Sequence, residues 1–306
     1  MFREFLQKDG LSLDRLHTLI LLDEAGSLTR AAGGDSGKQA RMSHHLRELG
    51  EFFGAKLTDR VGRTLSLTPK GKELATIART QFRTLKDFSE SVRQTEREWV
   101  VGAGDSVLQW WLLPALSKAD LPQRWSLHNL RTTEVVTRVA DERVDFGVVR
   151  RDAVRDTVES ADIGVVEYVI VVPNRIRTRN LTGRTALIDL PHATIGNDGQ
   201  LTARLREVAA KHGGIFKPQL KCDSLGLCMA AVKTGKYAAV LPTYILDASI
   251  LANVEVLETE LDELKRPMAL IWNRRAVETL GPKARGAKDI LLAALRAEER
   301  ARSGEG

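Results

Sequence analysis

Residues 27–49 read SLTRAAGGDSGKQARMSHHLREL, and this stretch decides the fold of the N-terminal region. The chain restarts at Ser27, and the alanines Ala31 and Ala32 then favour a short helix. The glycines of Gly33–Gly37 favour a turn, since glycine loosens a helix, and we expect the next helix to begin at Gln39. The apolar residues of that helix recur every three or four positions, at Met42, Leu46, Leu49 and Phe53. Two helices joined by a glycine-containing turn predict a helix-turn-helix.

Segments on both sides of this helix pair complete a small domain. Upstream, leucines at helical spacing predict a helix between Ser12, a good N-cap, and Gly26, which ends it. Downstream, two short extended segments, Leu57–Arg60 and Thr64–Leu67, flank a Val-Gly-Arg turn and predict a β-hairpin. Residues 1–68 are therefore predicted to form a winged helix-turn-helix, with the hairpin as its wing.

A long helix is predicted next, from Pro69 to about Glu96, with Thr68 as its N-cap. Its apolar stripe is interrupted at Gln81 and consists of Leu74, Ile77, Leu85, Phe88 and Val92. A long helix with so little else to bury either pairs with a second copy of itself or docks on a neighbouring domain. We expect pairing, and we assign residues 69–98 to a linker helix that mediates dimerisation.

Positive charge is concentrated in this N-terminal region. Between Arg30 and Lys86 there are 12 lysines and arginines against 5 acidic residues, so this stretch accounts for the net charge of +6 and the remainder is near neutral. A basic third on a neutral body indicates a contact with a polyanion. The second helix of a helix-turn-helix enters the major groove, where Arg and Lys pair with guanine and Gln with adenine. The candidate DNA contacts on the two helices and the wing are Ser27, Thr29, Arg30, Lys38, Gln39, Arg41, Ser43, His44, His45, Arg47, Arg60 and Arg63.

The motifs SLTRAA (27–32), QARMS (39–43), LREL (46–49), FGAKL (53–57) and LTPKG (67–71) together resemble the LysR-type transcriptional regulators. The resemblance covers about the first 95 residues. It implies a sequence-specific DNA-binding transcription regulator that assembles as a homodimer or homotetramer. The chain departs from the family pattern at Asp35, where an apolar residue is usual, at His44, where Arg is common, and at Thr58, where an aromatic residue is common.

After Trp99 short apolar strands alternate with helices, which favours an α/β domain with a mostly parallel sheet. The predicted strands are Trp99–Gly102, Ser126–Leu130, Phe146–Val149, Val165–Val172, Pro218–Cys222, Ala238–Leu241, Val254–Leu257 and Met268–Trp272. The predicted helices are Leu108–Leu116, Glu134–Asp141, Leu201–Lys211, Leu225–Lys233, Tyr244–Leu251 and Ala287–Arg300. The resemblance implies that residues 99–306 form a two-lobed effector-binding domain similar to periplasmic solute-binding proteins. Lobe I is expected at about 99–172 plus 269–306, and lobe II at about 173–268.

Ligands of such domains bind at the carboxyl ends of strands and between lobes. Polar residues at those positions are candidate contacts to a small-molecule effector, although the same residue types also favour turns and helix caps. Free backbone amides at the helix starts near Ser106 and Leu201 favour an anionic effector. The candidate effector-binding residues are Asp105, Ser106, Val107, Arg131, Thr132, Thr133, Arg150, Asn197, Asp198 and Gln200.

The sequence carries no catalytic motif: no G-x-S-x-G, P-loop or H-E-x-x-H is present, and we predict that the protein is not an enzyme. His44 and His45 diverge by about 100° on a helix and cannot share one metal ion. Cys222 and Cys228 lack metal-binding spacing and are expected to fill apolar space, so no metal or cofactor is predicted. No apolar segment suits a membrane span and the first residues do not resemble an export signal, which predicts a cytoplasmic protein without a membrane partner.

Three alternatives stay open at this point. The first is a DNA-binding regulator that needs no effector and keeps a vestigial cleft. The second is a cytoplasmic solute-binding protein with an incidental N-terminal domain. The third is an enzyme that uses Cys222 with a histidine distant in sequence.

Overall fold

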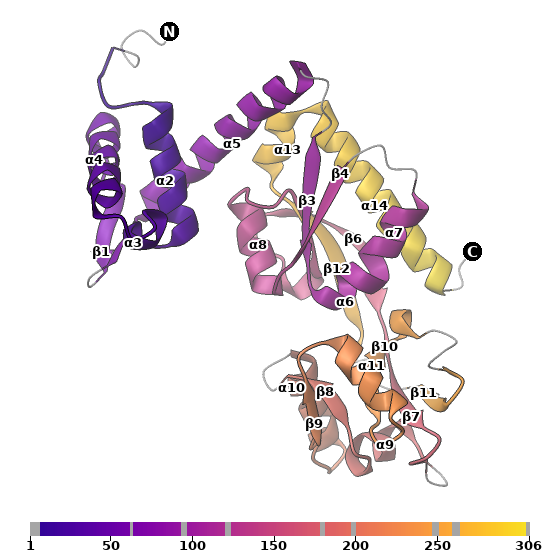
Figure 1. Cartoon of the computed structure of the whole chain (residues 1–306). Coiled ribbons are helices and arrows are strands. Elements are labelled where there is room, and N and C mark those ends of the chain that lie inside the picture. The colour runs from indigo at the N-terminus through magenta and orange to yellow at the C-terminus, as the bar shows by residue number, and fades with distance from the viewer. Residues whose placement is uncertain are drawn as a thin grey trace. The chain divides into compact units, whose positions relative to one another are not determined.

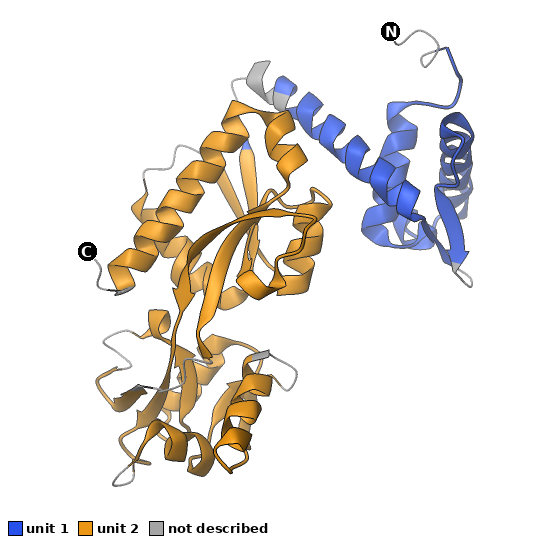
Figure 2. Ribbon diagram, turned by 180° about the vertical axis from the view of Figure 1, so that it is seen from behind, with its two compact units in different colours: residues 1–97 blue, residues 98–306 orange. Residues whose placement is uncertain are grey.

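The computed structural model describes residues 7–61, 64–92, 97–119, 124–177, 181–196, 200–246, 251–258 and 264–303. The chain divides into two compact units, residues 1–97 and 98–306, which Figure 2 colours separately. Figure 1 labels the helices and strands of both units. Within the described ranges, no helix has the length and the apolar composition that crossing a membrane requires.

The first unit is a helix-turn-helix with a hairpin and a long helix, as predicted. Its elements are α2 (Leu13–Ala25), α3 (Leu28–Ala31), α4 (Ser36–Phe53), β1 (Thr58–Val61), β2 (Thr64–Leu67) and α5 (Pro69–Val92). The Ser12 hydroxyl caps α2 by accepting a hydrogen bond from the Arg15 amide, and Gly26 ends the helix in the left-handed conformation. The buried side chains of α2 and α4 form one core, made of Leu19, Leu22, Met42, Leu46 and Leu49 together with Leu28 and Leu57.

The start of α4 differs from the prediction. The helix begins at Ser36 and not at Gln39, because the Asp35 carboxylate accepts a hydrogen bond of 2.9 Å from the Lys38 amide and caps it. Gly37 falls in the first turn, where the amides have no partner within the helix, so its cost to the helix is offset by the cap. The buried stripe also ends differently, since Phe52 is 6% exposed and Phe53 is 36% exposed.

The long helix α5 starts against the hairpin. The Thr68 hydroxyl accepts a hydrogen bond from the Gly71 amide and donates one to the Lys56 carbonyl. A Cβ at Gly71 would lie 2.1 Å from the Leu57 carbonyl oxygen, so only glycine fits at this crossing. The first half of α5 then buries Ala75 and Ala78. The linker helix is therefore continuous with the DNA-binding fold at its N-terminal half.

The second unit contains two lobes built on separate sheets. Lobe I has a five-stranded sheet in the order β4-β3-β5-β12-β6. Its strands are β3 (Glu98–Ala103), β4 (Arg124–Asn129), β5 (Phe146–Arg150), β6 (Glu159–Val166) and β12 (Arg266–Trp272). Its helices are α6 (Asp105–Val107), a π-helical turn (Leu108–Leu112), α7 (Leu113–Lys118), α8 (Thr132–Ala140), α13 (Arg274–Leu280) and α14 (Pro282–Ser303), with a 3₁₀ turn at Arg151–Ala153.

Lobe II is built on two smaller sheets, in the orders β10-β7-β11 and β8-β9. Its strands are β7 (Tyr168–Pro173), β8 (Ala193–Ile195), β9 (Leu220–Cys222), β10 (Ala239–Pro242) and β11 (Val254–Glu258). Its helices are α9 (Gly183–Asp189), α10 (Gln200–Lys211) and α11 (Leu225–Lys233). Of the predicted helix Tyr244–Leu251, the first residues belong to a 3₁₀ turn at Thr243–Ile245 and Leu251 is helical, while residues 247–250 lie outside the described ranges.

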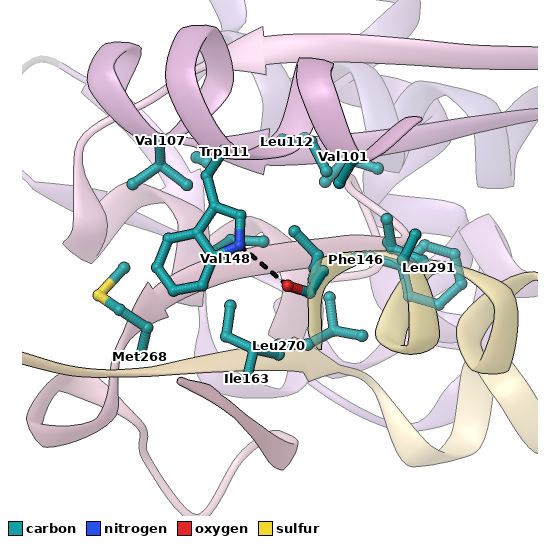
Figure 3. Close-up of a cluster of buried hydrophobic side chains, with 14 of the residues drawn as sticks. Val101, Val107, Trp111, Leu112, Phe146, Val148, Ile163, Met268, Leu270 and Leu291 are labelled. Atoms are coloured by element: carbon teal, nitrogen blue, oxygen red, sulfur yellow. Dashed lines mark hydrogen bonds between the residues drawn. The ribbon is translucent and has the colours of Figure 1, made fainter. Parts of the chain in front are cut away.

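The core of lobe I is centred on Trp111. Figure 3 shows its ring among Val148, Ile163 and Met268, with the indole nitrogen donating a hydrogen bond to the Leu295 carbonyl oxygen over 3.1 Å. This bond satisfies the one polar atom of the side chain, which is 2% exposed. Because Leu295 belongs to α14, the bond also joins the C-terminal helix to the sheet's helical cover.

Two predictions about the sheets are wrong. The five-stranded sheet of lobe I is mixed, because β12 runs antiparallel to β5 and β6. The three-stranded sheet of lobe II is antiparallel, because β7 runs antiparallel to β10 and β11. The predicted single strand Val165–Val172 is two strands, β6 in lobe I and β7 in lobe II, and the chain passes between the lobes at Glu167. The lobe boundary therefore lies at Glu167 and not at residue 172, and an apolar run alone could not reveal the change of sheet.

Candidate nucleic-acid interface and ligand cavity

The recognition helix α4 buries one face and exposes a basic one. Met42, Leu46 and Leu49 hold the helix on the core of the first unit. Of the predicted DNA contacts on this helix, Lys38, Arg41, Ser43, His44 and Arg47 are exposed, and Gln39 is half-buried. The helix thus presents cationic and amide side chains on a surface that its packing keeps free.

An ionised carboxylate, that of Asp35, caps the first turn of this helix. The hydrogen bond from the Lys38 amide, the largest cause, holds the pKa of the Asp35 carboxyl below its ordinary value, although slight desolvation opposes it. Asp35 therefore stays ionised at neutral pH and caps the helix. The cap holds in place the first turn of α4, which carries Lys38 and Gln39.

The two adjacent histidines make different contacts. His44 Nδ1 lies 2.9 Å from Glu48 Oε2, which also accepts a hydrogen bond of 2.8 Å from Arg15 Nε. Burial raises the pKa of Glu48, but the hydrogen bonds and charges of Arg15 and His44 outweigh it and the pKa is lowered. Arg15 belongs to α2, so this network joins α2 to α4.

His45 also braces α4 against α2. The Thr18 hydroxyl donates to the Asp14 carbonyl over 2.9 Å, so His45 Nδ1, at 3.0 Å from Thr18 Oγ1, acts as the donor to that oxygen. His45 is half-buried, and its contact with α2 gives it a structural role that the sequence did not reveal.

The remaining predicted DNA contacts lie on α3 and the wing. The Ser27 hydroxyl caps α3 and also accepts a hydrogen bond from Arg30 Nε over 3.1 Å. Thr29 and Arg30 are exposed on this short helix, as is Arg60 on β1. Arg63 lies outside the described residues.

The predicted stripe on α5 has two parts. Leu74 and Ile77 are half-buried, and Leu74 packs on the core of the first unit. Leu85 and Phe88 are 53% and 69% exposed, respectively. The side chain of Val92 lies outside the described part of the structure. The C-terminal half of α5 therefore carries large apolar side chains that are more than half exposed.

The second unit contains a cavity of about 710 Å³ whose walls come from both lobes. Four predicted effector residues line it together: Arg131, Thr132, Thr133 and Arg150. The sequence did not single out the other lining residues, which are Val136, Asp152, Ala153, Val154, Arg155, Tyr168, Leu201 and Arg266. Tyr168 begins β7 and Arg266 begins β12, so both residues lie where the chain passes between the lobes. They were not identified from the sequence, because the change of sheets at Glu167 was not recognised in it.

Arg266 is the most unusual residue of this cavity. It is 4% exposed, and its Nη2 finds no hydrogen-bond partner within the described ranges. Its guanidinium donates to the Tyr168 hydroxyl. Burial, followed by the nearby charges of Arg204 and Arg150, lowers the pKa of Arg266, while Tyr168 and Asp152 oppose that shift. Burial also raises the pKa of the Tyr168 hydroxyl, with Arg266 and Arg150 acting in the opposite direction.

Three other predicted effector residues, Asp105, Ser106 and Val107, are not among the described residues that line this cavity. Asp105 accepts a hydrogen bond of 2.7 Å from Gln109, and Ser106 hydrogen-bonds Tyr244. Val107 is 8% exposed and belongs to the lobe I core, where its side chain packs and is not available to a ligand. Asn197 and Asp198 lie outside the described residues, and of Gln200, which begins α10, only the backbone is described.

Cys222 and Cys228 are buried in the lobe II core, and burial, together with the neighbouring Cys222, raises the pKa of the Cys228 thiol. The described residues contain no group of three or more His, Cys, Asp or Glu that would suit a metal ion.

Known proteins resemble this chain over most of its length. The model of bacterial regulatory helix-turn-helix proteins of the lysR family matches residues 13–72, and the LysR substrate binding domain model matches residues 93–296. The uncharacterized HTH-type transcriptional regulator YfiE of Escherichia coli (strain K12) is 24% identical over 233 residues, which cover 72% of this chain and 78% of YfiE.

Solved structures share the fold. ArgP from Mycobacterium tuberculosis has a TM-score of 0.68 at 17% identity, covering 92% of this chain and 96% of ArgP. Full-length LysG from Corynebacterium glutamicum has a TM-score of 0.62 at 17% identity, covering 93% of this chain and 98% of LysG. Because the substrate-binding match alone spans more than half of the sequence, the chain belongs to the LysR family, as a DNA-binding transcription regulator with an effector-binding domain.

Proposed function

We propose that this regulator reads a specific DNA sequence with the N-terminal half of α4. The observation that carries the proposal is that Lys38 and Arg41 are exposed in the first two turns of that helix, while its buried stripe packs on the core of the first unit. Gln39 and Arg41 have the side-chain chemistry that pairs with adenine and guanine edges in the major groove. Ser43 and Arg47 are also exposed further along this helix, and we assign them as additional contacts.

The phosphate backbone is contacted on both sides of this helix. We assign Ser27, Thr29 and Arg30 of the preceding helix to one side, and Arg60 and Arg63 of the wing to the other. His44 remains a candidate groove contact because it is exposed. The contact of His45 with Thr18 holds α4 against α2. We therefore expect a substitution of His45 to shift the position of α4 as well as to weaken the DNA contact.

Two copies are proposed to pair through α5. Leu85 and Phe88 are the exposed large apolar residues that such a pairing would cover, with Leu74, Ile77 and Val92 extending the stripe. Pairing through a helix that begins at the wing sets the spacing of two recognition helices on DNA. We keep residues 1–68 as the DNA-binding domain, 69–98 as the linker helix and 99–306 as the effector domain, and we expect dimers or tetramers.

The cavity of the second unit is the proposed effector site. In the LysG structure an arginine is bound as effector, and by analogy a small molecule between the lobes controls this chain. The effector would act by binding one arrangement of the assembly more tightly than another. We propose that the protein regulates without a catalytic step, needs no cofactor or metal, and acts in the cytoplasm, because the DNA that it reads lies there.

Binding of the full-length protein to DNA fragments from around its own gene, measured across a salt series, tests this proposal. Nanomolar binding to one fragment that weakens steeply with salt supports a regulator that contacts phosphates and reads bases. Equal binding to every fragment, or none, would contradict it.

A further inference from the structure

The cavity between the lobes holds a buried cation, Arg266, to which the described residues bring no carboxylate within ion-pair distance. Arg266 is 4% exposed, its Nη2 has no partner in the described part of the chain, and its hydrogen bond goes to the neutral hydroxyl of Tyr168. A guanidinium removed from water loses solvation free energy unless an anion or several acceptors replace the water. Since Arg266 lines the cavity, the missing acceptor is expected to come from the molecule that fills it.

A second anion-binding feature lines the same cavity. Helix α8 begins at Thr132, its N-cap residue Arg131 makes no side-chain capping bond, and the helix has nine residues. The first amides of a helix have no partner within it, and they carry its partial positive charge. Thr132 and Thr133 also add hydroxyl donors to the cavity wall. The close packing behind α8, where a Cβ on Gly147 would lie 2.5 Å from Val135, holds this helix start in place.

The charges of the described residues on the cavity wall do not balance. Arg131, Arg150, Arg155 and Arg266 line it with a single described carboxylate, that of Asp152. Asp152 Oδ2 lies 3.4 Å from Arg150 Nη1, so its charge is already shared with that arginine. Arginine is the side chain best suited to hold carboxylates and phosphates, because it donates two parallel hydrogen bonds. A neutral or cationic occupant would leave this excess of positive charge uncompensated.

We propose that the cavity binds a small organic molecule with two acidic groups, one held by Arg266 and Tyr168 and the other by the N-terminal turn of α8 with Arg131. The inference rests on the proposed function in that it names the chemical class of the effector. Two kinds of compound share this chemistry, aliphatic dicarboxylates and phosphorylated carboxylic acids. The lining residues besides Tyr168 include no other aromatic side chain, which favours an aliphatic skeleton.

The test is isothermal titration of the full-length protein at constant ionic strength with four probes. Succinate and phosphoglycolate carry two acidic groups, butyrate carries one, and succinamide carries none. Binding of either diacid at least about tenfold tighter than butyrate, and no binding of succinamide, supports the proposal. The diacid that binds more tightly shows whether the site prefers a dicarboxylate or a phosphorylated carboxylic acid. Equal binding of butyrate and the diacids, or no binding of any diacid, overturns it.

Variants assign the binding to these residues. Arg266→Gln should weaken diacid binding roughly tenfold to a hundredfold, the loss expected for a charged hydrogen-bonded contact. It should leave the stability of the unliganded protein unchanged or higher, since it removes an unpaired buried charge. Arg131→Gln, at an exposed position, gives a second reading if Arg266→Gln folds poorly. Arg274→Gln is the matched control, because Arg274 is an exposed arginine of α13 paired with Glu278. Unchanged diacid affinity in both Arg266→Gln and Arg131→Gln would contradict the site.

DNA binding on the same preparations separates this inference from the proposed function. Selective DNA binding without diacid binding would refute the ligand class and leave the DNA-reading proposal standing. Diacid binding without selective DNA binding would refute the DNA-reading proposal and support the ligand class.

Discussion

Arg79 of α5 and Asp23 of α2 form a buried ion pair, with 2.9 Å between Arg79 Nη2 and Asp23 Oδ2. The two side chains are 8% and 10% exposed. Because α2 packs on the recognition helix and α5 carries the proposed pairing surface, this pair joins the part that reads DNA to the part that joins subunits. The angle between α2 and α5 must stay fixed if an effector-driven change in the arrangement of the subunits is to move the recognition helices.

Removing one partner of this pair should be costly. Asp23→Ala removes the carboxylate that lies 2.9 Å from the buried Arg79 guanidinium, and we expect a loss of about 3–5 kcal/mol in the free energy of unfolding of the first unit. The tryptophans of the sequence all lie at position 99 or later, so fluorescence would miss this unit. Hydrogen exchange of the α2 and α4 amides is the suitable measurement. Glu51→Ala, which breaks the exposed pair with Arg47, serves as control and should change stability by less than about 1 kcal/mol. Similar protection in Asp23→Ala and Glu51→Ala would contradict the role of the buried pair.

The cap of the recognition helix is a second test. Asp35→Ala removes the acceptor of the Lys38 amide, and we expect faster exchange of the first α4 amides and weaker DNA binding. Asp35→Asn keeps the side-chain oxygen and should retain both properties. The lowered pKa of Asp35 sets the pH dependence: the carboxylate form stabilises the fold above the ordinary pKa of an aspartate, and this contribution is lost as acid protonates it. Equal exchange in the Ala and Asn variants would show that the cap does not hold the helix start.

Sequence patterns predicted most of the first unit because each signal there is local. Ser12, Gly26 and the Met42–Leu46–Leu49 stripe act within one or two turns of their own helix. The start of α4 was missed because glycine propensity was weighted above the cap supplied by Asp35. Tyr168 and Arg266 were missed for a different reason. They meet across a crossing between two sheets, and the pairing of Arg266 with Val166 joins residues a hundred positions apart, which no local period records.

The pairing surface on α5 gives a third prediction. Leu85→Asp places a charge in the exposed apolar stripe and should convert the dimer to monomer at concentrations where the wild type is paired. Lys86→Asp is the matched control, since the next residue of a helix points about 100° away. Sedimentation velocity of both variants measures the change. An intact dimer in Leu85→Asp would show that the stripe is not the interface.

Acid should destabilise lobe II through His192. This side chain is 1% exposed, its Nε2 donates to the Ala186 carbonyl over 2.8 Å, and burial lowers its pKa although that hydrogen bond opposes the shift. Below the ordinary histidine pKa of 6.5 the unfolded chain binds a proton that the folded chain does not, so stability falls as pH decreases. We expect a loss of about 1 kcal/mol per pH unit below about 6.5, and a flatter profile in His192→Gln. Urea unfolding across this pH range measures both, and parallel profiles would exclude His192 as the cause.

The most direct test of the central claim is the DNA affinity of Arg41→Ala beside that of the wild type, measured by fluorescence anisotropy. Each protein is titrated onto the selected fragment and onto a scrambled fragment of the same length, across a salt series. Lys72→Ala, which removes an equal charge from an exposed position on α5, is the control. If α4 reads bases, Arg41→Ala binds the selected fragment about tenfold to a hundredfold more weakly and the scrambled fragment almost as well as the wild type does. Unchanged affinity for the selected fragment, or an equal loss on both fragments, would contradict base reading by this helix.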